Sequence, residues 1–209
     1  NVATLSSRWT PDADGATATG DFPCFILFRN GVLYLESPVF EAVASYHLAR
    51  ALPLSDTAHA PDTASSIEPG AVARRWLRDG ATHHITAAHM FSVKSQEAMD
   101  RLSAWLEANP LRLRVAGLGS VCDTNTAVTR QQLLRARNAF CGGDAGCAST
   151  AGEDGAAANR AHYVVFSCPE YKQMYEETVP GARLCLHMTL AFTENDIHNQ
   201  CKDENTLVM

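Results

Sequence analysis

The chain has 209 residues, of which 46% are hydrophobic and 19% are charged. This is enough apolar material to build a buried core, and it excludes wholesale disorder. With 17 Lys and Arg against 23 Asp and Glu, the net charge is −6. Such a chain does not attract nucleic acid or an anionic membrane as a whole, so a nucleotide or an RNA end would need a local basic site. No apolar run approaches the ~18 to 20 residues of a membrane span, and we expect no membrane partner.

The beginning of the chain has the composition of a linker. It starts at Asn1 with neither a Met nor an apolar leader, and residues 1–20 are small and polar. Segments of this kind are typical of tails and connections between domains. We therefore expect a flexible segment over 1–20, one domain over 21–209, and a longer parent chain that carries further domains.

The first half of the domain predicts a β-hairpin, two helices and a further strand. An Asn-Gly turn signal separates the two hairpin strands, and Ser37 followed by Pro38 marks the start of a helix. The elements follow as strands over 22–28 and 32–36, a helix from Ser37, a polar loop over 52–70, a basic helix over 71–79 ended by Gly80, and a strand over 82–91.

The second half continues the alternation of helices and strands. It predicts an amphipathic helix over 95–108, a strand over 111–121 with a bend or bulge at its glycines, a helix over 128–140, a strand over 162–168, a helix over 169–178, a strand over 184–192, and a short last strand over 206–209. The low-complexity stretch 141–160 predicts a mobile loop. The whole pattern favours a layered α+β fold.

The chain has seven cysteines, an odd number, and no two of them form a CxxC motif. Cys24, Cys168 and Cys185 lie in apolar stretches, where a reduced cysteine behaves as a small hydrophobic residue. A disulfide framework is usually denser and found in a shorter chain. We therefore predict a reducing compartment, the cytoplasm or nucleus. Pairing of Cys141 with Cys147 on oxidation remains an alternative.

Two predicted strands carry the same triplet of residue types. The first reads His84-Ile85-Thr86, and the second reads His187-Met188-Thr189. Successive side chains on a strand alternate between faces, so the His and the Thr of each triplet share one face, ~6.6 Å apart along the strand. The middle residue then points into the core. Each strand thus presents one imidazole and one hydroxyl to the same surface.

Two such strands placed side by side have the chemistry of a phosphodiester site. One imidazole can take a proton from the attacking oxygen while the other protonates the leaving oxygen, and histidine is suited to both because its ordinary pKa is about 6.5. Threonine hydroxyls can donate hydrogen bonds to the phosphate oxygens. The pattern therefore predicts His84, Thr86, His187 and Thr189 as catalytic residues, with no cofactor. Which histidine is the base stays open, and ordinary half-buried strand histidines are the alternative interpretation.

Three histidines in and beside the first triplet, His83, His84 and His89, are candidate metal ligands. On a regular strand, however, His83 and His89 share the face opposite His84 and lie ~20 Å apart. That distance is too long for one ion. We therefore predict no metal.

At this point the chain resembles the 2H phosphoesterase superfamily. That superfamily includes bacterial LigT-type RNA ligase-like proteins, plant and fungal cyclic phosphodiesterases, and branches associated with RNA repair. The similarity covers about residues 80–209: HITA at 84–87, the helix at 95–108, RLRVAGLGSV at 112–121, HYVVFS at 162–167 and HMTLAF at 187–192. One departure is Ala87, which stands where members often have a bulkier apolar residue.

The resemblance implies a fold and an activity. The fold would have two lobes related by a pseudo-twofold axis, with antiparallel sheets facing a central cleft and helices outside. The activity would be hydrolysis of a cyclic phosphodiester, most simply a 2′,3′-cyclic phosphate on a nucleotide or at an RNA end, by a pair of histidines. A 2′-5′ linkage, a cyclic phosphate of ADP-ribose, and a module that binds an RNA end without turnover remain open.

Candidate substrate-binding residues lie just before the first triplet and on a later strand. Arg74, Arg75 and Trp76, with Arg78, form a basic segment that contains one aromatic residue. Such a segment can hold a nucleic-acid backbone and stack a base, although a solvated helix face is the alternative. Tyr163 is a second candidate for stacking a base.

Overall fold

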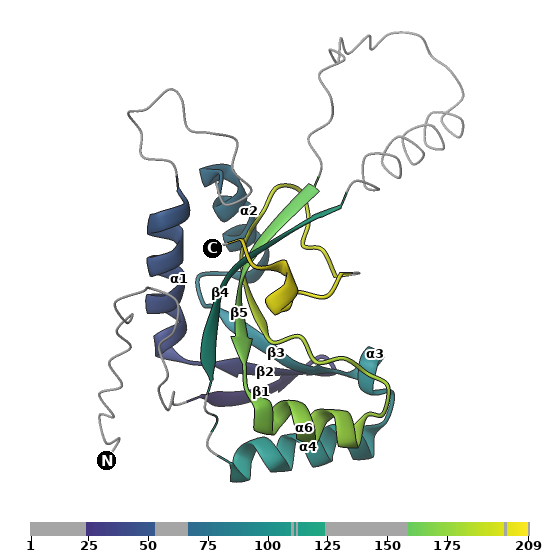
Figure 1. Cartoon of the computed structure of the whole chain (residues 1–209). Coiled ribbons are helices and arrows are strands. Elements are labelled where there is room, and N and C mark those ends of the chain that lie inside the picture. The colour runs from purple at the N-terminus through teal and green to yellow at the C-terminus, as the bar shows by residue number, and fades with distance from the viewer. Residues whose placement is uncertain are drawn as a thin grey trace, which may run out of the picture.

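A computed structural model describes residues 24–52, 67–109, 111, 113–123, 159–198 and 200–208. Over these residues the protein is a mixed α+β structure with two three-stranded antiparallel sheets (Figure 1), so the predicted α+β class is confirmed. The predictions for residues 1–20, 128–140 and 141–158, and the pairing of Cys141 with Cys147, lie outside the described residues.

The first sheet has the order β1-β2-β3. It comprises β1 (Phe25–Arg29), β2 (Val32–Glu36) and β3 (His84–His89). The hairpin between β1 and β2 turns at Asn30 and Gly31, which both have left-handed backbones, with φ of 52° and 76°. This is the turn geometry that an Asn-Gly pair favours, because it matches the twist of the flanking strands.

The second sheet has the order β4-β5-β6. It comprises β4 (Arg114–Asp123), β5 (Asn159–Ser167) and β6 (His187–Phe192). The predicted irregularity in the glycine-bearing strand is confirmed, because the pairing of β4 with β5 shifts between Val115 and Gly117. At Gly119 a Cβ atom would lie 2.5 Å from Cε2 of Tyr163, so only glycine lets β4 pass this ring.

Helices cover the sheets and begin and end largely where the sequence predicts. Ser37 and Ser95 accept hydrogen bonds as the N-caps of α1 (Pro38–Ala51) and α4 (Gln96–Ala108), and Gly80 closes α2 (Pro69–Asp79) with φ of 80°. The helices are α1 (Pro38–Ala51), α2 (Pro69–Asp79), α3 (Met90–Val93), α4 (Gln96–Ala108), α6 (Pro169–Thr178) and the 3₁₀ helix η1 (Glu204–Thr206). Figure 1 shows α4 and α6 side by side, and α2 packs on β6.

Several predicted elements begin or end at residues other than those expected. The strand predicted over 82–91 stops at His89, because the His89 side chain accepts a hydrogen bond from the Phe91 N–H and so starts α3. Strand β5 begins at Asn159, inside the predicted mobile loop. In place of the last predicted strand there is η1, followed by a single bridge between Leu207 and Gly119.

One hydrophobic core joins the two sheets. Ile85 of β3 and Met188 of β6 have no exposed surface and belong to the same cluster of buried side chains. The Tyr171 hydroxyl of α6 donates a hydrogen bond to the Ala87 carbonyl of β3, at 3.1 Å. The two triplets are therefore attached to one rigid core.

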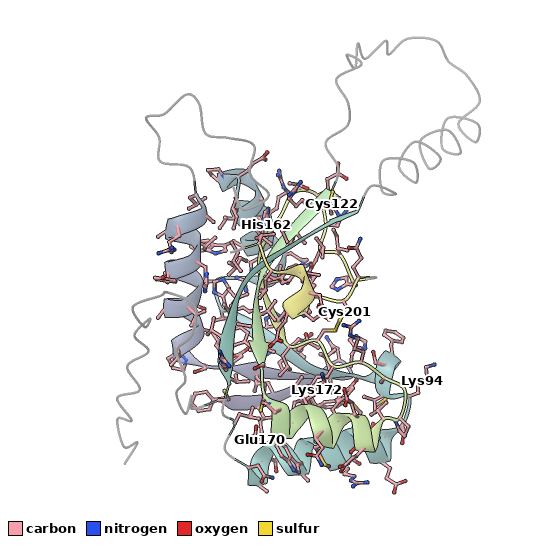
Figure 2. The ribbon with its side chains drawn as sticks, viewed as in Figure 1. Lys94, Cys122, His162, Glu170, Lys172 and Cys201 are labelled. Atoms are coloured by element: carbon pink, nitrogen blue, oxygen red, sulfur yellow. A yellow bond between two sulfur atoms is a disulfide. The ribbon has the colours of Figure 1, made fainter. Side chains whose placement is uncertain are left out.

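A disulfide overturns one expectation about the cysteines. Cys185 is bonded to Cys201, which is labelled in Figure 2, so the prediction that Cys185 is a reduced hydrophobic residue is wrong. The segment after β6 folds back and brings the two Cα atoms to 6.2 Å, a contact that no local pattern reveals. The bond does not support the reducing compartment predicted from the cysteine spacing. Within the described residues, no helix is long and apolar enough to cross a membrane.

The disulfide should contribute measurably to stability. Its partners are 16 residues apart, and cross-linking a loop of that length lowers the entropy of the unfolded chain by an equivalent of about 3 kcal/mol. We expect the double variant Cys185→Ser, Cys201→Ser to lose about that much free energy of unfolding in urea titrations. Cys122→Ser is the control. Equal stability of the wild type in oxidising and reducing buffer would contradict the expectation.

Candidate active site

The two His-X-Thr triplets meet at one cavity. Strands β3 and β6 come from different sheets and lie against one another. Between them and their neighbours is a cavity of about 710 Å³, and His84, Thr86, His187 and Thr189 all line it. A cavity of this volume is typical of sites that bind small molecules.

The two triplets have the same pattern of burial. In each, the His and the Thr are half-buried while the residue between them is completely buried, as the alternation of a strand requires. The residues behind the cavity are Ile85 and Met188, which anchor both triplets in the common core. The faces predicted from the sequence are therefore the faces observed.

Both motif strands also carry one extra residue at the same place. In β3, Tyr34 pairs with Thr86 while Leu33 pairs with Ala88, which leaves Ala87 as the extra residue. The pairing of β6 with β5 skips Leu190 in the same way. Each extra residue directly follows the Thr of its triplet. An extra residue of this kind is a β-bulge, which re-aims the side chains beyond it.

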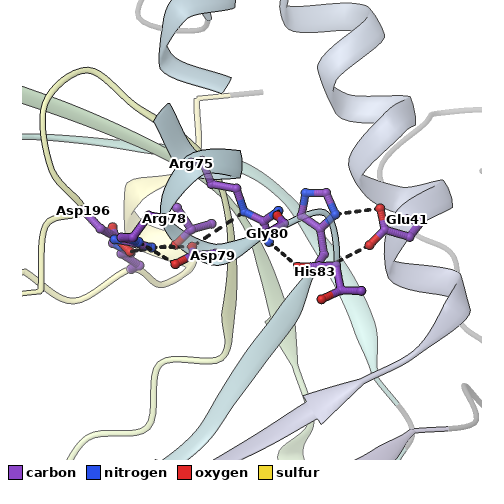
Figure 3. Close-up of polar contacts among 10 residues, drawn as sticks. Glu41, Arg75, Arg78, Asp79, Gly80, His83 and Asp196 are labelled. Atoms are coloured by element: carbon purple, nitrogen blue, oxygen red, sulfur yellow. Dashed lines mark hydrogen bonds and ion pairs between the residues drawn. The ribbon is translucent and has the colours of Figure 1, made fainter. Parts of the chain in front are cut away.

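The bulge in β3 changes the position of His89. On a regular strand His89 would face away from His84, but it lines the cavity together with His84. The prediction that it shares the face of His83 is therefore wrong, because Ala87 shifts the alternation by one residue. His83 itself is buried and contacts Glu41 of α1, with 2.9 Å between Nδ1 and Oε2 (Figure 3). Among the described residues, no group of three or more potential ligands could hold a metal ion.

His187 is held in one orientation and one tautomer. Its Nδ1 lies 2.9 Å from the carbonyl oxygen of Cys185. A carbonyl only accepts hydrogen bonds, so Nδ1 carries the proton and the neutral ring has its lone pair on Nε2. Burial lowers the pKa of His187 to about 4, and the positive charge of Lys202 acts in the same direction. The ring is therefore neutral at physiological pH and ready to accept a proton.

His84 is held less tightly. It makes an edge-to-face contact with Tyr34, with ring centroids 4.8 Å apart, and its ring nitrogens bond to no described residue. Burial lowers the pKa of His84 below its ordinary value, Asp79 opposes this, and Arg75 adds to the lowering. The two histidines of the cavity thus have different surroundings.

The two threonines also differ. The Thr189 hydroxyl donates a hydrogen bond to Oδ2 of Asp196, at 3.0 Å, so its proton is already engaged by this carboxylate. The carboxylate of Asp196 is buried and paired with Lys202. Burial alone would raise the pKa of Asp196, but Lys202 lowers it to about 2, so this carboxylate only accepts. Thr86, by contrast, has no hydrogen-bond partner for its hydroxyl in the described part of the chain.

Arg78 connects α2 to the segment after β6. Its Nε and Nη2 each donate to Asp79 at 2.6 Å, and Nη2 lies 3.3 Å from Oδ2 of Asp196 (Figure 3). Its guanidinium carbon lies 4.5 Å from the ring centre of Phe192. Arg78 lines the cavity and is about one-third exposed. It is therefore a cation held in place beside both triplets.

The residues predicted to bind substrate lie in different places. Arg75 lines the cavity, but it is 1% exposed and donates to the carbonyls of Gly80 and Thr82. Arg74 and Trp76 are exposed and do not line the cavity; Arg74 donates to the Phe192 carbonyl at 3.4 Å.

Tyr163 is completely buried behind the second triplet. Its hydroxyl donates to Thr206, its ring lies edge-to-face 5.8 Å from His187, and Nζ of Lys202 lies 5.3 Å from its centre. Arg75 and Tyr163 thus support the site from within.

Sequence reasoning missed other residues that line the cavity. These are Val32, Tyr34, Asp79, Phe91, Ser92, Asp196 and His198. Tyr34 was detectable in part, because it occupies a strand that neighbours the first triplet. Val32 lies on the same strand. Asp79 is the last residue of α2, and the others follow the ends of β3 and β6, where composition carries no signal of their position.

The comparisons with known proteins return nothing. No protein-family model matches the chain, and no curated protein or solved structure is significantly similar to it. The function must therefore be argued from the site itself.

The buried pair of Asp196 and Lys202 should be essential for stability. Both side chains are at most 3% exposed, and removing one partner of such a pair leaves a buried charge uncompensated, at a cost of about 3–5 kcal/mol. We expect Asp196→Asn to lower the free energy of unfolding by this amount in urea titrations. Glu176→Gln, which breaks an exposed pair with Lys172, is the control and should change it by less than about 1 kcal/mol. If both variants changed the free energy of unfolding by less than about 1 kcal/mol, the expectation would be contradicted.

Proposed function

We propose that the protein is a metal-independent phosphoesterase that hydrolyses cyclic phosphodiesters, with a 2′,3′-cyclic phosphate on a nucleotide or at an RNA end as its substrate. The observation that carries the proposal is the convergence of two His-X-Thr strands, from different sheets, on one cavity. Two imidazoles and a hydroxyl next to a fixed guanidinium are the groups that acid–base hydrolysis of a phosphodiester requires.

The arrangement of the sheets supports the resemblance to 2H phosphoesterases. In both halves the strand that carries the triplet is the last of three, pairs only with the central strand among the described residues, and has its bulge at the same position. In both halves a helix precedes it, α2 before β3 and α6 before β6. This internal similarity favours the two-lobed arrangement with a pseudo-twofold axis between the triplets.

The surroundings of the two histidines suggest their roles. His187 is neutral with its lone pair on Nε2, and we assign it as the base that takes a proton from the attacking water. As the new bond from the water oxygen to phosphorus forms, the bond from phosphorus to the 2′ or 3′ oxygen breaks, and His84 donates its proton to that leaving oxygen. The product is a phosphate monoester, and the proton gained by His187 returns to His84 through solvent.

The added negative charge of the transition state needs nearby donors. The Thr86 hydroxyl is available for this, and Arg78 supplies a positive charge. Thr189, whose proton is held by Asp196, acts as a positioning residue for the second half of the cavity. The proposal therefore gives the two threonines different roles.

Hydrolysis of the four nucleoside 2′,3′-cyclic phosphates in the presence of EDTA tests the proposal. We expect turnover by the wild type, and a loss of about 10²- to 10⁴-fold in His84→Ala and in His187→Ala, the range that positioned acid–base groups contribute. His47→Gln is the matched control, because His47 is a buried histidine of α1 that does not line the cavity. Its rate should stay near that of the wild type.

Two results would point elsewhere. Turnover that survives both alanine substitutions would exclude the two-histidine mechanism. A folded wild type that binds nucleotides without hydrolysing them would favour the alternative function, a binding module for an RNA end in a larger RNA-processing protein.

The pH profile tests the assignment of roles. The base is inactive when protonated, so activity should fall below pH 4, where His187 gains a proton. The acid is inactive when deprotonated, so activity should also fall as the pH rises past the pKa of His84, which lies below its ordinary 6.5. We expect kcat/KM to be greatest between about pH 4 and 6.5. A maximum above pH 7.5 would contradict this assignment.

A further inference from the structure

We infer that His89 and Phe91 form an aromatic platform that stacks the base of a nucleotide whose phosphate lies between the two triplets. The inference rests on the proposed phosphate site and adds to it the residues that hold the base, so that a cyclic phosphate with a base is bound better than one without. The first observation is the unusual exposure of an aromatic side chain. Phe91 is 83% exposed, although Val93 of the same short helix is buried.

The two rings are already arranged as a platform. Their planes are nearly parallel, at 16°, and their centroids lie 4.8 Å apart. The N–H of Phe91 donates a hydrogen bond to Nδ1 of His89 at 3.0 Å, which fixes the imidazole against the phenyl ring. One face of the Phe91 ring is thus covered by His89, while most of the side chain remains in solvent. A ring fixed in this way loses little freedom when a base stacks on it.

The platform belongs to the same cavity as the triplets. His89 and Phe91 line it together with His84 and Thr86. His89 reaches this face only because of the bulge at Ala87. Three residues along a strand span at most ~10 Å, so His89 lies within about one nucleotide length of Thr86. A phosphate at the triplets and a base at Phe91 are therefore compatible with one ligand.

The hydrogen bonding of His89 adds a polar contact. Nδ1 accepts from the Phe91 N–H, so in the neutral ring the proton is on Nε2. This N–H can donate to a nitrogen or oxygen on the edge of a base. Stacking itself does not depend on the base, because every base has an aromatic face. The platform therefore recognises bases in general and fits both mononucleotides and an RNA end.

Binding experiments test the platform without requiring turnover. Adenosine 2′-monophosphate, the monoester that hydrolysis would produce or resemble, is titrated into the wild type and into Phe91→Ala. We expect the Kd to rise by roughly 5- to 100-fold in the variant, the range given by loss of one base–aromatic stack. Phe91→Trp should retain or improve binding. Phe28→Ala is the control, because Phe28 is 55% exposed on β1 and does not line the cavity.

Turnover experiments separate this inference from the proposed function. Adenosine 2′,3′-cyclic phosphate and glycerol 1,2-cyclic phosphate are compared as substrates with and without a base. Phe91→Ala should raise the KM for the first and leave that for the second unchanged. If the wild type hydrolyses both substrates, but Phe91→Ala changes the KM for neither of them or for both equally, the function stands and the platform is wrong. If adenosine 2′-monophosphate binds through Phe91 but neither is hydrolysed, the platform stands and the function fails. No binding of adenosine 2′-monophosphate to the folded wild type overturns the platform.

Discussion

The alternation of side chains along β3 and β6 is the constraint on which the cavity depends. Ile85 and Met188 have no exposed surface and pack in one core, so the residues on either side of each must point the other way. A slip of one residue in either pairing would bury a histidine and expose an apolar side chain. The core that stabilises the fold therefore also determines which side chains can meet a ligand.

The two halves of the cavity share a backbone pattern and differ in what surrounds it. Around the second triplet, a carbonyl holds His187 and a buried carboxylate holds Thr189. No described residue holds His84 or Thr86 in the same way. Different surroundings are how a pair of similar titratable groups acquires separate acid and base roles. The asymmetry comes from the residues that flank β6, Cys185 before it and Asp196 after it, while the strands themselves stay alike.

Local signals in the sequence predicted much of the fold and the four triplet residues that meet at the candidate site. Period-two patterns, the Asn-Gly turn and the serine caps depend on neighbouring residues, so the strands, hairpin and helix starts could be predicted. The bulge at Ala87 could not, because an extra residue is visible only once strands are paired. The Cys185–Cys201 bond and the Asp196–Lys202 pair depend on how the chain folds back after β6.

The basic segment before β3 shows the same limit. The sequence places Arg74, Arg75 and Arg78 within one turn or so of each other, and nothing in their identity says which one faces a ligand. In the structure Arg75 supports the turn into β3, Arg74 lies outside the cavity, and Arg78 is at its wall. Only the docking of α2 on β6 distinguishes them.

The ring closed by Cys185 and Cys201 has a consequence for how the site assembles. It contains β6, both residues of the second triplet that face the cavity, and Asp196. Lys202 follows the ring directly and is six residues from Asp196, so the loop entropy lost when the two pair is small. The first triplet instead depends on the pairing of β3 with β2, two strands that lie far apart in the sequence. Because the entropy lost in closing a loop grows with its length, the groups around the second triplet are brought together at a lower entropic cost than those around the first.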